Sequence, residues 1–159
     1  MKGLNKKGFT LIELLAVIVV LAIVMVLATT TVLPYMANAR KESFALEANT
    51  LKNAASQAVS LITIGTIKDT SNYTKTDDGY CFTVGNLKDL GLFKKDDASY
   101  KGIVTVQKAE NGNAYEYIVE LENGEFYVKQ TATGDVTVDN VNDYEKDKVK
   151  QACTVSNAS

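Results

Sequence analysis

The acid Glu13 is the residue whose chemistry most needs an explanation, because it stands at the start of a long apolar run. It ends the stretch KKGFTLIE, residues 6–13, and every residue from Leu14 to Ala28 is apolar. An ionised acid at the centre of a bilayer helix costs roughly 2.5 to 3.5 kcal/mol, and it costs less near the helix end. The carboxylate of Glu13 therefore either reaches the lipid headgroups and the positive end of the helix dipole, or has a specific cationic partner.

The element that carries Glu13 has the length of a membrane span. From Phe9 the apolar run makes a helix of about 20 residues, roughly 30 Å long, which matches the hydrocarbon core of a bilayer. It is preceded by Lys2, Lys6 and Lys7. By the positive-inside rule the N-terminus lies in the cytoplasm and the chain after Tyr35 is exported, so we expect a single pass through the inner or cytoplasmic membrane.

Two ordinary export segments share this general pattern. Signal peptidase could cut after Val26-Leu27-Ala28, and an uncleaved signal anchor would keep the whole segment. Neither of them needs a carboxylate inside the apolar run, so both leave Glu13 unexplained.

The stretch KKGFTLIELLAVIVVLAIVMV, residues 6–26, resembles the N-terminus of the type IV pilin family, with its short basic leader, its glycine and its glutamate. The resemblance implies that a prepilin peptidase cuts between Gly8 and Phe9 and methylates the new amino group of Phe9. It implies that Glu13 neutralises the terminal amine of a neighbouring subunit during filament assembly. The implied partners are other copies of the chain, the peptidase, the membrane before assembly and the pilus assembly machinery.

The physical chemistry of the segment supports this pairing. Cleavage leaves a cation at Phe9 in the same low-dielectric layer as Glu13, and methylation retains its charge. Pairing the two groups offsets both desolvation costs. Phe9 and Glu13 also lie one helical turn apart, so the sequence leaves open whether the amine belongs to the same chain or to the next one.

Side chains suited to catalysis are scarce. The chain has no histidine, no nucleophile motif and no phosphate-binding loop, so we expect neither an enzyme nor a cofactor. A formal charge of -2 gives no reason to expect specific binding of nucleic acid. Acidic residues gather at Asp77-Asp78 and at Asp143, Glu145 and Asp147. Some pseudopilins bind calcium in their C-terminal region, but no EF-hand loop is present here, and we interpret these acids as solvated charge and predict no metal site.

The two cysteines, Cys81 and Cys153, have neither metal-site spacing nor the spacing of a redox motif. In an exported chain we interpret them as one disulfide, which contributes on the order of 4 kcal/mol in the chain-entropy account by closing a long loop. Two free buried thiols are the alternative. Pilins often close their last region with a disulfide, so the resemblance implies the same pairing.

The helix is expected to continue beyond the membrane, from residue 9 to about residue 63, with Gly65 closing it. Apolar residues recur at helical spacing on one face of its second half: Ala37, Phe44, Leu51, Ala55, Ala58 and Ile62. Pro34 is the only proline, and it removes the amide that would bond to the carbonyl of Thr30. A kink or local melting is predicted there.

An antiparallel meander is predicted from strands at 101–108, 114–122 and 125–131, and its apolar face covers the helix. In the second strand the apolar face is formed by Tyr115, Tyr117, Val119 and Leu121. The other face, which we expect to be mostly wet, carries Glu116, Ile118, Glu120 and Glu122. Asn123-Gly124 predicts a two-residue type I′ turn.

The remaining segments are assigned more coarsely. Residues 65–79 are interpreted as a polar loop, and Asn86 is predicted to cap a short helical turn. A strand is expected at 136–138, and Asn142 or Asp143 is predicted to cap a helix that ends near Ala152.

The expected fold is therefore α+β, a type IV pilin fold with a long N-terminal helix whose first half is transmembrane, packed against an antiparallel sheet. Residues 1–8 are the leader, 9–36 the membrane and filament-core helix, and 37–159 the exported head. We expect a structural subunit of a pilus, for which the resemblance implies adhesion and twitching motility. A pseudopilin or competence pilin is the alternative in the same machinery, and a non-polymerising, membrane-anchored binding domain is the alternative of another class.

Overall fold

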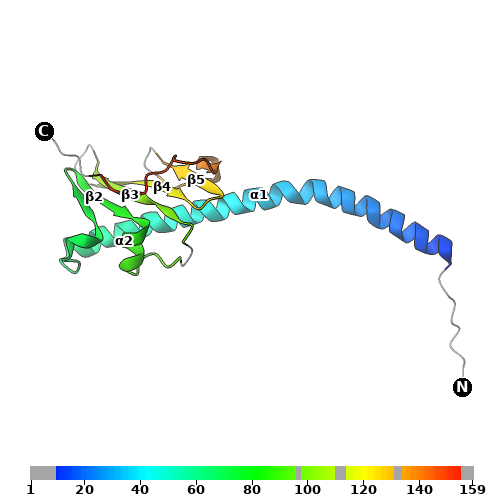
Figure 1. The fold of residues 1–159 in the computed structure, drawn as a ribbon, viewed down its shortest axis with the longest axis horizontal. Coiled ribbons are helices and arrows are strands. Elements are labelled where there is room, and N and C mark those ends of the chain that lie inside the picture. The colour runs from blue at the N-terminus through cyan, green and yellow to red at the C-terminus, as the bar shows by residue number, and fades with distance from the viewer. Residues whose placement is uncertain (1–9, 96–97, 110–113, 131–133, 155–159) are drawn as a thin grey trace, which may run out of the picture. The chain divides into compact units, whose positions relative to one another are not determined.

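The computed structural model describes residues 10–95, 98–109, 114–130 and 134–154, apart from the side chain of Thr31. The polypeptide divides into two compact units, Met1–Ala39 and Arg40–Ser159. Helix α1 (Leu11–Thr63) contributes residues to both units, and all the strands belong to the second (Figure 1). The predicted α+β class is confirmed, because a long N-terminal helix is combined with an antiparallel sheet.

Helix α1 is unbroken from Leu11 to Thr63, which confirms that the apolar segment continues as one helix. The helix runs through Pro34 without unwinding, so the predicted local melting is wrong there. The kink at Pro34 stays a prediction. The helix persists because proline removes only one backbone hydrogen bond, while the bonds of the turns on both sides remain. In the turn before it, the Thr29 hydroxyl donates to the Met25 carbonyl at 2.8 Å and the Thr30 hydroxyl to the Leu27 carbonyl at 3.0 Å.

Gly65 ends the helix as predicted. Its φ of +76° lies in the left-handed region, which glycine reaches without a steric cost. The amide of Thr66 donates to the Leu61 carbonyl at 2.9 Å, and that of Gly65 to the Ile62 carbonyl at 3.0 Å. This is the Schellman pattern of a helix C-terminus.

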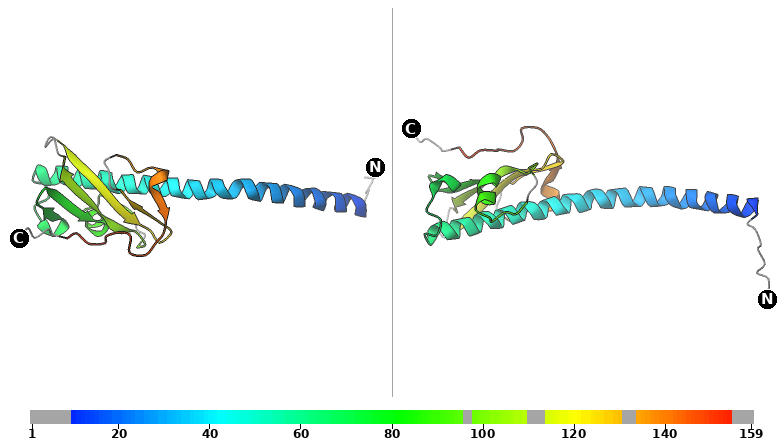
Figure 2. Two further views of the ribbon diagram at one scale, coloured as in Figure 1. Left: turned by 90° about the horizontal axis from the view of Figure 1, so that it is seen from above. Right: turned by 60° about the horizontal axis from the view of Figure 1, so that its bottom comes forward.

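The second unit contains a six-stranded antiparallel sheet in which each strand pairs with the next one along the chain. Its strands are β1 (Thr74–Thr76), β2 (Gly79–Thr83), β3 (Lys101–Lys108), β4 (Tyr115–Glu122), β5 (Phe126–Lys129) and β6 (Val141–Asp143). The three predicted strands are confirmed as β3, β4 and β5. Figure 2 shows the sheet lying across residues 40–63 of α1, which belong to the same unit.

The core of this unit lies between α1 and the inner face of the sheet, as the apolar stripe predicted. Leu51 of α1, Val104 of β3 and Leu121 of β4 are fully buried members of one cluster. The stripe is correct from Phe44 onward, but Ala37 is exposed and belongs to the first unit. We call the face of the sheet turned away from this core the outer face.

Two segments that were predicted as a loop and as part of a helix form strands instead. β1 lies inside the expected polar loop, and Thr76 of β1 faces Gly79 of β2 across Asp77-Asp78. The tail is corrected as well. Residues 138–140 form a short 3₁₀ helix, so the predicted strand at 136–138 is wrong. Val141 of β6 pairs with Val128 of β5, and residues 144–154 contain no helix, so the predicted C-terminal helix is wrong as well. The sheet edge offers backbone partners that local sequence cannot reveal.

Two local details differ from the prediction. Helix α2 (Val84–Asp89) is capped by Thr83, whose hydroxyl accepts from the Asn86 amide at 3.1 Å, so Asn86 is the third helical residue and completes a capping box. Between β4 and β5, Glu122 faces Tyr127, so the connection is wider than a type I′ turn. The Asn123 side chain accepts from the amides of the two residues that follow Gly124, which stabilises the wider turn.

Candidate functional site

The first turn of α1 is built by a reciprocal hydrogen-bonded pair, Thr10 and Glu13. The amide and the hydroxyl of Thr10 each donate to Oε2 of Glu13 at 2.8 Å. The Glu13 amide donates in return to Oγ1 of Thr10 at 3.3 Å. This is a capping box, which satisfies donors that have no partner within the helix. The T-x-x-E spacing in the sequence signals such a box, and our sequence analysis overlooked it.

The capping box uses only one oxygen of the Glu13 carboxylate. Among the described residues, Oε1 of Glu13 accepts no hydrogen bond, and the side chain is exposed. A carboxylate has about four acceptor positions, so Glu13 can cap its own helix and still receive a further donor. The predicted cleavage and methylation positions, Gly8 and Phe9, lie outside the described residues.

The rest of the first unit presents a continuous apolar surface. All described side chains of residues 10–39 are exposed, and that of Leu11 is 84% exposed. In length and composition α1 is able to cross a membrane. The large exposed residues include Leu14, Ile18, Leu21, Met25, Leu33 and Met36. An apolar surface of this extent needs cover by lipid or by protein.

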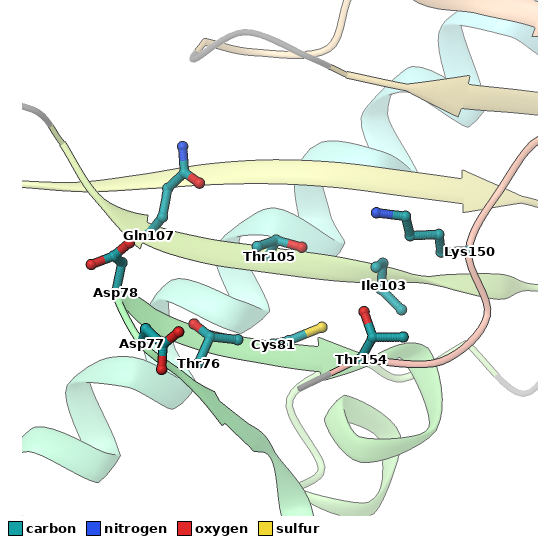
Figure 3. A pocket seen from close by; sticks show the side chains of 9 residues that line it. All are labelled: Thr76, Asp77, Asp78, Cys81, Ile103, Thr105, Gln107, Lys150 and Thr154. Atoms are coloured by element: carbon teal, nitrogen blue, oxygen red, sulfur yellow. The ribbon is translucent and has the colours of Figure 1, made fainter. Parts of the chain in front are cut away.

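The two cysteines are joined on the outer face of the sheet. Cys81 of β2 and Cys153 form a disulfide with an S–S distance of 2.04 Å. The bond holds the C-terminal segment beside a groove of about 250 Å³, which is bounded at one end by Asp77 and Asp78 and at the other by Lys150 and Thr154 (Figure 3). Its floor is formed by Thr105 and Gln107 of β3, beside Cys81.

The acidic groups of the sequence are dispersed in the structure. Asp143 pairs with Lys41 of α1 at 3.0 Å, and Glu145 pairs with Lys148 at 3.0 Å. Over the part of the chain that is described, no three residues of the metal-binding types come together. Asp143 and Glu145 therefore serve local contacts, and the Asp143 pair joins the sheet edge to the helix.

A partly buried ionic cluster also went unnoticed in the sequence. Glu47 of α1 is bound by Lys95 at 2.5 Å and by the hydroxyl of Tyr100. The hydrogen bond with Glu47 raises the pKa of Lys95. Burial, and then the hydrogen bond with Glu47, raise the pKa of Tyr100. This cluster ties the segment before β3 to the helix.

The face of β4 predicted to be wet is also partly covered. Glu120 is 6% exposed and Glu122 is 4% exposed. Oε2 of Glu120 accepts from the Lys150 amide at 3.1 Å, and Oε1 of Glu122 accepts from the Gln151 side chain at 3.0 Å. The alternation of β4 was correct, but the sequence does not reveal that the C-terminal segment returns over its outer face.

Comparison with known proteins bears on the N-terminal segment alone. The family model of the prokaryotic N-terminal methylation motif, which is the leader signature of type IV pilins and prepilins, matches residues 3–29. No curated protein and no solved structure matches this chain. The matched residues contain the sequence-predicted cleavage position, the capping box and most of the exposed apolar surface. This motif indicates a type IV pilin-like N-terminal segment, of the kind that pilins, pseudopilins and competence pilins carry.

Proposed function

We propose that the chain is a structural subunit of a type IV pilus, cut between Gly8 and Phe9, methylated at Phe9 and polymerised through α1. One observation carries the proposal: the methylation motif at residues 3–29 leads into a helix whose described side chains are all exposed as far as residue 39. Such a helix has lipid around it before assembly and other copies of itself afterwards. The residues 9–36 then form the filament core, and residues 37–159 form the head.

Glu13 has a role in this proposal that its capping box permits. Oε2 stays in the bond to Thr10, which keeps the first turn closed, while Oε1 receives the methylated amine of Phe9 from a neighbouring copy. Each of these charges costs free energy when it leaves water, and the pairing offsets both costs. The pair therefore sets the axial position of one subunit against the next.

The proposed location follows from the same segment. The basic residues at 2, 6 and 7 keep the N-terminus in the cytoplasm, and the head is exported. The disulfide between Cys81 and Cys153 supports an oxidising environment for the head. Adhesion and twitching motility are the activities we propose for the assembled filament.

Mass spectrometry of the chain purified from its cells tests the processing step. We expect a mature chain that starts at Phe9 and carries one methyl group. A chain that starts at Thr29, or an uncut chain, would overturn the proposal in favour of an ordinary exported or anchored protein. Electron microscopy of the cell surface then separates long pili from the short fibres expected of a pseudopilin or competence pilin.

Substitution of Glu13 tests the assembly step. Glu13→Gln keeps an oxygen for the Thr10 amide but removes the charge, so we expect normal cleavage and no filaments. Thr10→Val is the matched control, because it removes a hydroxyl of the capping box and leaves the carboxylate in place. If Glu13→Gln assembled filaments as well as the parent, the intersubunit pair would be refuted. Mass spectrometry of both variants excludes a processing defect.

A further inference from the structure

The C-terminal residues 145–154, which we call the strap, contact the outer face of the sheet without forming a helix or strand. Val149 is buried and Cys153 is half-buried, while the other strap residues are exposed. The strap meets the sheet through the disulfide to Cys81 and through hydrogen bonds to two carboxylates of β4. Figure 3 shows Lys150 and Thr154 of the strap next to Ile103 and Cys81.

We propose that the strap is a detachable cover that the disulfide holds closed, and that it opens without unfolding of the sheet when the disulfide is absent. The disulfide state would then decide whether the outer face of β3 and β4 is hidden or accessible. The proposal does not depend on filament assembly.

The groups beneath the strap favour the open state. Glu120 and Glu122 are neighbours on the outer face of β4, and both are almost completely buried. The strap supplies one cation, Lys150, but its ammonium lies 3.8 Å from Glu120 and its side chain is 62% exposed. Lys129 and Lys101 are the cross-strand partners of Glu120 and Glu122, and among the described residues neither forms an ion pair with these acids. Oε2 of Glu122 is buried and has no hydrogen-bond partner among the described residues. A buried carboxylate oxygen without a partner is costly, and opening of the strap would return it to water.

The apolar contacts of the strap contribute little free energy to the closed state and do little to offset this cost. Val149 is its one buried aliphatic side chain among the described residues, and Val149 is not part of the main core cluster. Ile103, on the outer face, is also outside that cluster although it is only 3% exposed. The covalent bond to Cys81 is therefore the contact that keeps the strap closed.

The rest of the unit does not need the strap. The main cluster fills the inner face of the sheet against α1, and no strap residue belongs to it. The neighbouring edge strand β6 ends at Asp143, before the strap begins, and keeps its pairing with β5. Opening should therefore be local. It would expose Ile103 and the thiol of Cys81, and it would remove the wall of the groove that Lys150 and Thr154 provide.

Hydrogen–deuterium exchange of the full chain in detergent micelles tests the proposal. In the double variant Cys81→Ser, Cys153→Ser, we expect the amide of Lys150, which donates to Glu120, to exchange at least about tenfold faster than in the disulfide form. The amides of β3 and β4 should keep their rates. Equal protection of the strap in both forms would overturn the proposal, and so would faster exchange throughout the sheet.

A third substitution tests the role of the buried carboxylates. Glu122→Gln, added to the double serine variant, removes the charge and keeps an oxygen for the Gln151 side chain, so we expect slow exchange of the strap to return in part. Glu116→Gln is the matched control, because Glu116 lies on the same face of β4 but is bound to Gln107. If both changes had the same effect, the burial of Glu122 would not be what opens the strap.

Discussion

Asn49 of α1 holds the backbone of Val136, which lies in the segment before the 3₁₀ helix Val138–Asn140. Its Oδ1 accepts from the Val136 amide at 2.8 Å, and its Nδ2 donates to the Val136 carbonyl at 2.8 Å. Val136 is 4% exposed, and its side chain belongs to the main core. Asn49→Ala would leave both backbone groups without a partner next to that core.

The magnitude follows from these two bonds. A buried polar group that loses its partner costs roughly 1–3 kcal/mol. Because Asn49 is only half-buried, water can replace part of the lost bonding. We therefore expect the free energy of unfolding to fall by about 2–4 kcal/mol.

Urea unfolding of the full chain in detergent micelles, followed by circular dichroism, measures this loss. Asn53→Ala is the matched control, since Asn53 is exposed on the same helix and the change has the same effect on helix propensity. We expect the control to change the stability by less than about 0.5 kcal/mol. Asn49→Asp keeps the acceptor and loses the donor, so it should be intermediate. Equal stability of the Asn49→Ala and Asn53→Ala variants would refute the reasoning.

Two further predictions concern the same unit. Thr83→Ala removes the acceptor that caps α2, so the free energy of unfolding in urea should fall by about 1 kcal/mol. Thr83→Ser keeps the hydroxyl and should stay close to the parent. Similar losses in both variants would contradict the role of the hydroxyl. At alkaline pH the chain should lose stability, because burial, with Tyr115 and Tyr73 nearby, raises the pKa of Tyr80 above its ordinary value of 10.0. The unfolded chain then releases this proton first, so stability present below pH 10 is lost as pH rises above it. Thermal unfolding at a series of pH values should show a shallower loss for Tyr80→Phe than for the parent, and an unchanged slope would show that Tyr80 does not contribute.

The methylation motif and the main elements could be recognised in the sequence because local patterns determine them. A stretch of apolar residues at membrane length makes a helix in any context, and the strict alternation in β4 allows one assignment of its inner face. Gly65 could be recognised as a helix end for the same reason, since the left-handed backbone there suits glycine.

The errors lie where a distant segment supplies the partner. Residues 74–76 are three polar residues that become strand β1 only because β2 lies beside them. The tail after Asn140 carries helix-capping residues, yet it pairs with β5, whose free edge satisfies its backbone groups. Glu120 and Glu122 follow the pattern of a solvated face and are nevertheless buried, because the strap returns from far along the chain.

By itself, the sequence determined the membrane-length helix, the acid at its start and the leader that links the chain to type IV pilin-like proteins, because each depends on residues close together along the chain. Tertiary structure alone decided that the outer face of β4 is covered and that Asn49 holds Val136. In both cases the groups that meet lie far apart in the sequence, and their hydrogen bonds depend on a geometry that only the folded chain provides.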